Sequence, residues 1–238
     1  MNSRPWAALF MLFLLLPTAV LGECAYAREK TAAYRCIQQT ETPAEDSFFS
    51  DSLMIGDSIC ASLDDYDALP ELWFETKIGQ SAQAAYQSRN ISYQGSRCTM
   101  ASLAGLASPE RLFIMLGSNG LDLKTPEAAL SDYHAMLDAI LREAPETTVY
   151  IVSLTPVLSR IQKRFPGLTS EAVAQFNAML LDLAQEHGIH YIDVATPLLD
   201  EEGKWAVPDY VTGDGLHLTR AGAQLVAQAI RLQVCEEE

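Results

Sequence analysis

Residues 111–119 read RLFIMLGSN, an unbroken apolar run over 112–116 that is followed at once by glycine, serine and asparagine. A run without alternating polar residues is typical of a strand that is buried on both faces, as in a parallel sheet. Polar residues directly after such a strand lie at the edge of the sheet where α/β proteins present their reactive groups. We therefore expect a buried strand at 111–116 and functional residues just beyond it.

The rest of the chain alternates strand-like and helix-like segments around this run. The helix-like segments carry apolar residues at i, i+3 and i+4, for example Val173, Phe176 and Leu180. This alternation predicts an α/β fold in which helices cover a central parallel sheet. Further strands are expected at 53–55, 73–78, 148–154 and 189–194, and helices near 80–88, 126–143, 170–187 and 220–234.

Composition and length fit one globular domain behind an export signal. The chain has 238 residues, of which 49% are hydrophobic, which suits a single core. The apolar run over 7–16 is shorter than a membrane span, and residues 25–27 form a small-x-small cleavage pattern. We expect a signal peptide at 1–27, an exposed leader at 28–50 and one folded domain at 51–238.

Cleavage after Ala27 would make the mature protein secreted or associated with the cell envelope, without stable insertion in the membrane. A lipid anchor on Cys24 fits less well, because Glu23 stands where lipoproteins carry a small residue. An uncleaved anchor is the remaining alternative.

Charge argues against nucleic acid as a partner. The formal net charge is −15, and removal of 1–27 leaves it unchanged because Arg4 and Glu23 cancel. An acidic domain is repelled by a phosphate backbone, whose binding depends on clustered lysine and arginine.

Four cysteines remain after cleavage, and they are compatible with two disulfides in any of three pairings or with four buried thiols. A Cys36–Cys235 bridge would join the two ends of the domain and would stabilise it by about 2–4 kcal/mol. The spacing of cysteines and histidines matches no zinc motif, so no metal is expected. The four cysteines are Cys36, Cys60, Cys98 and Cys235.

Ser58 is the candidate nucleophile. It follows the predicted strand at 53–55 in the turn Gly56-Asp57-Ser58, and it would open a helix whose free N–H groups favour developing negative charge. A serine hydroxyl needs a base to take its proton before it can attack. Taken alone, Ser58 fits a helix N-cap better than a nucleophile, since serine is among the preferred capping residues.

Asp214 and His217 are the candidate acid and base. Their spacing lets the carboxylate reach the imidazole Nδ1–H, which fixes the tautomer and leaves Nε2 to accept the serine proton. Of the other histidines, His134 and His187 belong to predicted helices and look structural, and His190 opens a predicted strand. Taken alone, Asp214 and His217 fit a loop pair with local hydrogen bonds better than a catalytic dyad.

Three donors are candidates for an oxyanion hole: the backbone N–H groups of Ser58 and Gly79 and the side-chain amide of Asn119. Gly79 and Asn119 follow two separate predicted strands, as donors that converge on one developing charge must. The alternatives are a strand-ending glycine and an Asn-Gly turn.

Taken together, Gly56-Asp57-Ser58, Gly79, Gly117-x-Asn119 and Asp214-x-x-His217 resemble, in order, the four sequence blocks of the SGNH (GDSL-type) hydrolases. The resemblance spans residues 53–234. It implies a flavodoxin-like three-layer α/β/α sandwich, an esterase activity without metal or organic cofactor, and the roles given above for Ser58, Asp214, His217, Gly79 and Asn119. Water that hydrolyses the acyl-serine would complete the reaction, whereas a sugar hydroxyl in its place would make the protein an acyltransferase.

The residue after Asn119, Gly120, bears on which substrate we expect. Many SGNH hydrolases have aspartate at this position, whereas Asn119-Gly120 is similar to bacterial members that act on cell-wall or carbohydrate O-acetyl groups. We expect a small-acyl ester, with a glycan as the candidate acceptor. A silent binding module would be expected to lack a member of the triad, and none is missing.

Three residues are candidates for substrate binding. Arg160 lies in a basic segment with Lys163 and Arg164, which would suit an anionic glycan, although such a cluster is more often a solvated surface. Trp205 and Tyr210 precede Asp214, where an aromatic ring would either stack on a sugar or pack beneath the loop.

Overall fold

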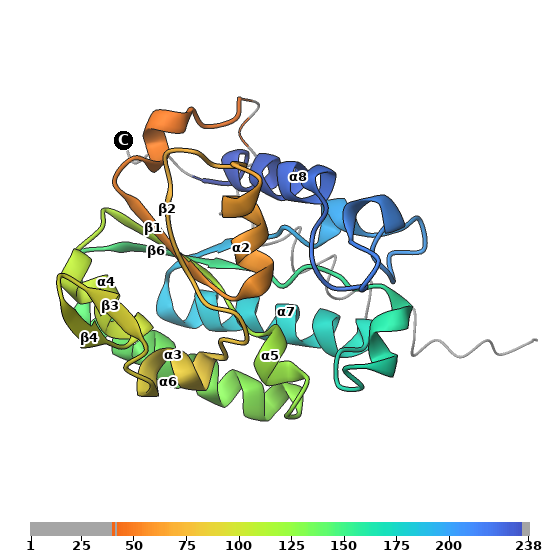
Figure 1. The fold of residues 1–238 in the computed structure, drawn as a ribbon, viewed down its shortest axis with the longest axis horizontal. Coiled ribbons are helices and arrows are strands. Elements are labelled where there is room, and N and C mark those ends of the chain that lie inside the picture. Colours follow the sequence, from red (N-terminus) through yellow and green to blue (C-terminus); the bar gives the residue numbers. More distant parts are fainter. Residues whose placement is uncertain (1–39, 41, 235–238) are drawn as a thin grey trace, which may run out of the picture.

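The computed structural model describes residue 40 and residues 42–234. Five parallel strands form the central sheet in the order β2-β1-β5-β6-β7, and helices lie on both of its faces (Figure 1). The predicted three-layer α/β/α sandwich is confirmed. The strands of the sheet are β1 (Ser52–Gly56), β2 (Trp73–Thr76), β5 (Arg111–Met115), β6 (Thr148–Val152) and β7 (His190–Ile192).

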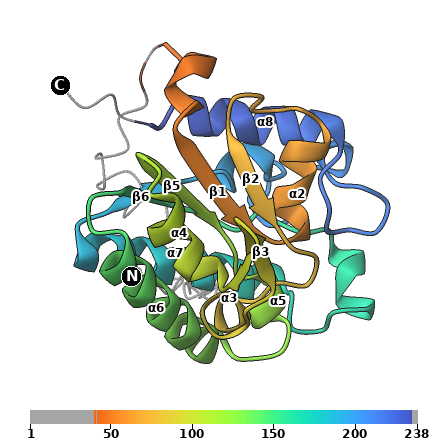
Figure 2. The same ribbon diagram turned by 60° about the vertical axis from the view of Figure 1, so that its left-hand side comes forward.

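Two groups of helices cover the sheet. Helices α2 and α8 pack together on one face, and α4, α6 and α7 lie on the other, with α3 against α6 (Figures 1 and 2). The helices are α2 (Ser58–Asp65), α3 (Ala82–Gln87), α4 (Met100–Ala107), α5 (Ser118–Leu121), α6 (Pro126–Glu143), α7 (Ser170–His187) and α8 (Arg220–Arg231). Short 3₁₀ turns are η1 (Asp46–Phe49), η2 (Ser159–Lys163), η3 (Thr196–Leu198) and η4 (Pro208–Tyr210). Among the described residues, no helix has the length and apolar character that crossing a membrane requires.

The sheet order creates one crevice. β1 pairs with β2 on one side and with β5 on the other, so the chain winds away from β1 in both directions. Ligands of such sheets bind at this switch point, beyond the carboxyl ends of the strands. The segments that follow β1, β2 and β5 therefore lie side by side, and they are the segments that carry Ser58, Gly79 and Asn119.

A two-stranded hairpin, which the sequence did not indicate, interrupts the α/β alternation. β3 (Ile91–Tyr93) pairs antiparallel with β4 (Ser96–Cys98). Its two-residue loop places Gln94 at φ 46° and Gly95 at φ 79°, the left-handed geometry that matches strand twist. Glutamine is not a usual residue at the first of these positions, so the pattern that predicts a hairpin was missing.

The described part of the leader expected at 28–50 is exposed or half-buried except at one residue. Phe49 is fully buried, with its ring 6.0 Å from that of Phe113 in β5. Arg231 at the end of α8 holds the segment in place, because it pairs with Asp46 and donates a hydrogen bond to the Ala44 carbonyl at 2.9 Å. The folded domain thus begins before residue 51. The signal peptide at 1–27 and the start of the leader lie outside the described residues.

Cys60 and Cys98 are free thiols, and both are buried. Each of the three two-disulfide pairings expected from the sequence includes Cys60, so an arrangement with two disulfides is ruled out. Cys36 and Cys235 lie outside the described residues.

Candidate active site

Ser58 is the first residue of α2 and follows β1 after a single intervening residue. That residue, Asp57, is the N-cap, since its Oδ1 accepts a hydrogen bond from the Ile59 N–H at 2.9 Å. The N-cap interpretation of Ser58 is therefore wrong, and its hydroxyl is not used in capping. Gly56 allows the abrupt transition because a Cβ on it would lie 2.2 Å from the Cβ of Cys60.

The structure brings Ser58, His217 and Asp214 into one hydrogen-bonded chain. His217 Nε2 lies 3.0 Å from Ser58 Oγ, and His217 Nδ1 lies 2.6 Å from Asp214 Oδ2. The first of these contacts joins residues 159 positions apart in the sequence. In the tautomer with the proton on Nδ1, the imidazole donates to the carboxylate and Nε2 is free to accept the serine proton.

The loop that carries His217 and Asp214 is closed on itself just before α8. The Thr212 N–H donates to the His217 carbonyl at 2.7 Å, and Val211 and Leu218 form a β-bridge. Gly215, at φ 89°, makes the turn inside this loop, and its carbonyl accepts from the Leu158 N–H at 3.0 Å. The loop therefore presents acid and base as one small, cross-braced unit.

Asp214 is held ionised. Burial works against its charge, but hydrogen bonds from the His217 ring, the Leu216 N–H and the Thr212 hydroxyl outweigh it and hold the pKa of Asp214 well below its usual range. A permanent carboxylate beside Nδ1 stabilises the imidazolium that forms when Nε2 takes a proton.

Two backbone N–H groups at the crevice are free to receive an oxyanion. Those of Ser58 and Gly79 have no hydrogen-bond partner among the described residues. The Ser58 N–H is one of the first N–H groups of α2, which have no partner within a helix. Gly79 lies at φ 73° in a turn closed by a bond from the Gln80 N–H to the Lys77 carbonyl at 3.1 Å.

Unlike the Ser58 and Gly79 N–H groups, the side-chain amide of Asn119 already has hydrogen-bond partners. Its Nδ2 donates to Asp57 Oδ2 and to the Gln80 carbonyl, both at 3.1 Å, so both of its N–H bonds are in use. To donate to an oxyanion as well, Asn119 must share one of these hydrogens or give up one partner. The geometry makes it first of all a bridge between the residue before Ser58 and the residue after Gly79.

Asp57 is the part of this site that sequence reasoning missed. Besides capping α2, its Oδ2 accepts from Asn119 and from Ser118 Oγ, the latter at 2.7 Å. Complete burial raises the pKa of Asp57, although the hydrogen bonds from Ser118 and Ile59 oppose the shift. Its position in Gly56-Asp57-Ser58 was visible, but its partners lie 61 and 62 residues away.

A hollow of about 260 Å³ adjoins these donors. Gly79 and Asn119 line it, and so does Leu216, the residue before His217. Its wall is partly apolar and partly polar, and it is lined by Gly79, Ser81, Ser118, Asn119, Asp122, Leu123, Phe165, Leu168 and Leu216.

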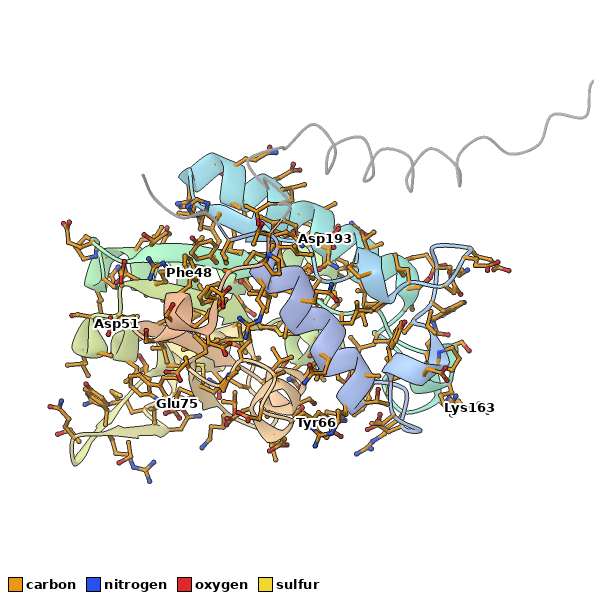
Figure 3. The ribbon with its side chains drawn as sticks, turned by 90° about the horizontal axis from the view of Figure 1, so that it is seen from above. Phe48, Asp51, Tyr66, Glu75, Lys163 and Asp193 are labelled. Atoms are coloured by element: carbon orange, nitrogen blue, oxygen red, sulfur yellow. The ribbon has the colours of Figure 1, made fainter. Side chains whose placement is uncertain are left out.

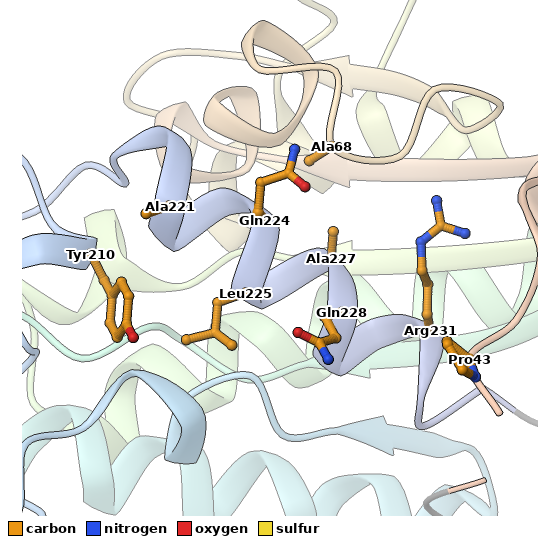
Figure 4. A pocket seen from close by; sticks show the side chains of 9 residues that line it. All are labelled: Pro43, Ala68, Tyr210, Ala221, Gln224, Leu225, Ala227, Gln228 and Arg231. Atoms are coloured by element: carbon orange, nitrogen blue, oxygen red, sulfur yellow. The ribbon is translucent and has the colours of Figure 1, made fainter. Parts of the chain in front are cut away.

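None of the three candidate substrate-binding residues lines this hollow. Tyr210 lies in a different hollow, along the outer side of α8 (Figure 4). Trp205 is half-buried under Lys204, whose Nζ is 5.5 Å from the ring centroid. Arg160 packs against the catalytic loop and donates from Nη1 to the Gly213 carbonyl at 3.3 Å, while its neighbour Lys163 lies at the periphery (Figure 3). Their role in binding stays a prediction.

Residues 54–225 match the model of the GDSL-like lipase/acylhydrolase family. The chain belongs to this family. This GDSL-family protein is accordingly an enzyme of the esterase and acylhydrolase type, as predicted. No curated protein sequence matches it.

Solved structures share the fold of this GDSL-family chain at low identity. A GDSL-like lipase from Bacteroides thetaiotaomicron is 18% identical, with a TM-score of 0.58, and the match covers 87% of this chain and 94% of that one. A carbohydrate esterase of family 3 from Talaromyces cellulolyticus is 16% identical, with a TM-score of 0.55 and coverages of 75% and 93%. A carbohydrate acetylesterase family member from Sinorhizobium meliloti is 18% identical, with a TM-score of 0.52 and coverages of 76% and 95%.

Proposed function

We propose that this GDSL-family enzyme is a secreted serine esterase that removes small acyl groups, acetyl above all, from a carbohydrate or cell-wall glycan. The observation that carries the proposal is the chain of hydrogen bonds from Asp214 through His217 to Ser58, with distances of 2.6 and 3.0 Å. It lies beside a hollow with free N–H donors, which is what acyl transfer through serine requires.

In the proposed reaction, Ser58 Oγ attacks the ester carbonyl while His217 Nε2 takes the hydroxyl proton. The tetrahedral intermediate collapses, His217 returns the proton to the leaving alcohol, and an acyl-serine remains. Water, deprotonated by His217, then releases the carboxylic acid and restores Ser58. Asp214 keeps the imidazole in the productive tautomer throughout.

The negative charge of each tetrahedral intermediate is stabilised first by hydrogen bonds from the Ser58 and Gly79 N–H groups. Both are free in the resting enzyme, so no existing hydrogen bond has to break before they donate. Asn119 holds the two segments at a fixed separation and joins as a third donor when one of its hydrogens is shared. One such donor is worth about 10²–10³ in kcat in a well-studied serine protease.

A small acyl group is supported by the modest hollow and by the fold neighbours described as carbohydrate esterases. One observation favours a longer acyl chain instead. Leu123, which lines the hollow, is 79% exposed, and Ile78, next to Gly79, is 88% exposed. Apolar side chains in these positions would contact the first carbons of a longer chain.

The test is hydrolysis of p-nitrophenyl acetate, butyrate and octanoate by the wild type, by Ser58→Ala and by Ser62→Ala. Ser62 is on the same helix one turn later, so its replacement controls for the loss of a serine from α2. We expect acetate to be cleaved with the highest kcat/KM and Ser58→Ala to lose on the order of 10⁴–10⁶ in kcat. Preference for octanoate would replace the acetyl proposal with the longer-chain one, and activity retained in Ser58→Ala would overturn the mechanism.

An acyltransferase with the same triad is separated from a hydrolase by adding sugar acceptors to the acetate assay. For a hydrolase, p-nitrophenol and acetate are released in equal amounts whether or not the sugar is present. Acetylated sugar at the expense of free acetate would instead support transfer.

Export is the remaining part of the proposal, and it is supported by the sequence over 1–27. Mass spectrometry of the protein recovered from the culture medium or cell envelope should give an N-terminus at Arg28. An intact Met1 on that protein would contradict it.

A further inference from the structure

His134, Asp138 and His187 form a compact cluster outside the active site. Their ligand atoms all lie within 4.8 Å of one another. His134 and Asp138 are one turn apart on α6, and His187 is the last residue of α7, a helix that packs against α6 (Figure 2). Because 53 residues separate the two histidines, the spacing of histidines along the sequence could not reveal the cluster.

The two imidazoles converge through the same ring atom. Their Nε2 atoms are 3.1 Å apart, and the rings stand at 87° to each other. Two neutral imidazoles can share one hydrogen there only if one is in the Nε2–H tautomer and the other is not. If both rings instead carry their hydrogen on Nδ1, two Nε2 lone pairs face each other, and a cation between them would accept both.

The distances suit a tetrahedral metal site. Zinc binds histidine nitrogen at about 2.0–2.1 Å, so two nitrogen ligands at the tetrahedral angle lie about 3.3–3.4 Å apart. The observed 3.1 Å is within a few tenths of an ångström of that separation, and Asp138 Oδ1 lies 3.7 Å from His134 Nε2. The three ligand atoms lie within 4.8 Å of one another, so the Asp138 carboxylate must move closer for all three to bind one ion.

We propose that His134, Asp138 and His187 bind a divalent zinc ion that clamps the end of α7 to the middle of α6. Two imidazoles and one carboxylate are a ligand set that zinc accepts, with water as the fourth ligand. The protein's net charge of −15 favours a cation at its surface.

This site is remote from the ester chemistry. His187 lies just before β7, which begins at His190, and so marks the amino-terminal edge of the sheet, whereas Ser58 follows the carboxyl end of β1. The ion therefore has no access to the acyl-serine, and its effect is on the stability of the helix pair. Gly188, in the left-handed conformation at φ 65°, ends α7 and fixes where His187 stands.

Calorimetric titration of the full-length, EDTA-treated protein with ZnCl₂ tests the site, together with thermal unfolding with and without zinc. We expect one ion per chain and a rise in Tm of about 5 °C at a hundredfold excess over Kd. Loss of an outer-shell partner, a residue that only contacts a metal ligand, lowers metal affinity by roughly 10–100-fold. His134→Gln and His187→Gln each remove a ligand itself, so each should weaken zinc binding by more than that. Asp138→Asn should weaken binding less than either.

Two control variants separate this site from other zinc sites. Glu186→Gln removes a charge next to His187 without touching the cluster, so it should keep the wild-type Kd if binding is more than charge attraction. His217→Gln, which removes the active-site imidazole, should also keep it. Circular dichroism of each metal-free variant shows whether it is folded.

Zinc that binds the doubly substituted His134→Gln, His187→Gln protein with unchanged affinity would overturn the proposal. So would a folded wild type that binds no zinc, since a shared hydrogen between the two imidazoles would then account for the contact. Loss of binding in His217→Gln alone would assign the ion to the active site instead.

Discussion

Asp214 accepts hydrogen bonds from the Thr212 hydroxyl, the Leu216 and His217 N–H groups and the His217 ring. In Asp214→Asn the amide can offer an N–H to Nδ1, which favours the wrong tautomer and leaves Nε2 protonated. We expect kcat to fall by about 10⁴ with little change in KM, as the corresponding change does in serine proteases. Steady-state kinetics with p-nitrophenyl acetate measure it.

Thr212→Val is the matched control for this prediction, since it removes one bond to the same carboxylate and leaves its charge and its contact with His217. Its activity should remain within about tenfold of the wild type. A loss in Asp214→Asn no larger than that of Thr212→Val would mean that the carboxylate does not orient the base.

Asp57 makes stability depend on pH in an unusual direction for an aspartate. Its pKa is higher in the folded protein than in the unfolded chain, because it is buried. Between these two values the folded state holds more protons, so the free energy of unfolding falls as pH rises through that window and is constant above it. In Asp57→Asn this fall should be absent, which urea denaturation at a series of pH values from about 3.5 upward would detect.

Ser118→Ala extends the test of Asp57. It removes a hydrogen bond that favours ionised Asp57, so the fall in stability should continue to higher pH than in the wild type. An identical pH profile for the wild type and Asp57→Asn would show that this carboxyl is not the group responsible.

The individual site residues were predictable to the extent that each stands directly after a predicted strand or within a short loop. Ser58 met the first condition, Asp214 and His217 met the second, and the structure brings the three together. What the sequence could not show is where each hydrogen bond goes. Whether the Asn119 amide is free or bound depends on the Asp57 and Gln80 positions, which only the folded chain brings together.

At the level of elements, the start of α8 positions the catalytic loop. A Cβ on Gly222 would lie 2.1 Å from the Tyr210 carbonyl oxygen, so the helix packs on the backbone that leads into Asp214. We expect Gly222→Ala to destabilise the protein by about 1–3 kcal/mol or more and to lower kcat/KM, because the loop must move away. Denaturant unfolding and the acetate assay measure the two effects.

Gly213→Ala is the control for this change. Gly213 lies inside the same loop, but a Cβ there meets no atom within 4 Å. Its stability should stay within about 0.5 kcal/mol of the wild type. Equal costs for the two substitutions would mean that helix packing at Gly222 does not set the position of the loop.

The long helices were the easiest elements to predict, and physical signals at their ends explain why. The observed bounds of α6 and α7 match the predicted 126–143 and 170–187, since Thr125 and Thr169 cap them and Gly188 ends the second. Short elements lack such signals. The hairpin strands have three residues each and α5 has four, too few for a hydrophobic period to appear.

At the scale of the whole molecule, the core encloses two unpaired thiols. Cys60 is fully buried and Cys98 nearly so, and burial raises the pKa of both thiols. We expect both to react with a maleimide orders of magnitude more slowly in native protein than in urea, because the thiolate is the reactive form and access is blocked. Mass spectrometry of peptides after labelling identifies each cysteine; either one found in a disulfide would contradict the structure.

The global arrangement was predictable as a class, because alternating strands and helices leave few ways to build a sheet. The packing of residues 46–49 against the core was not predictable, because Phe49 lies at the end of a polar stretch. Its partner Phe113 and the clamping Arg231 are remote in sequence.

The spacing of three residues between Asp214 and His217 has a consequence for how the enzyme can be switched. Asp214 and His217 belong to the same closed loop, so any displacement of that loop moves both away from Ser58 together. Displacement of the loop as a unit would therefore not leave the base in place without its carboxylate. A regulator or inhibitor that moved the loop before α8 would therefore switch off the acid and the base together, in one step.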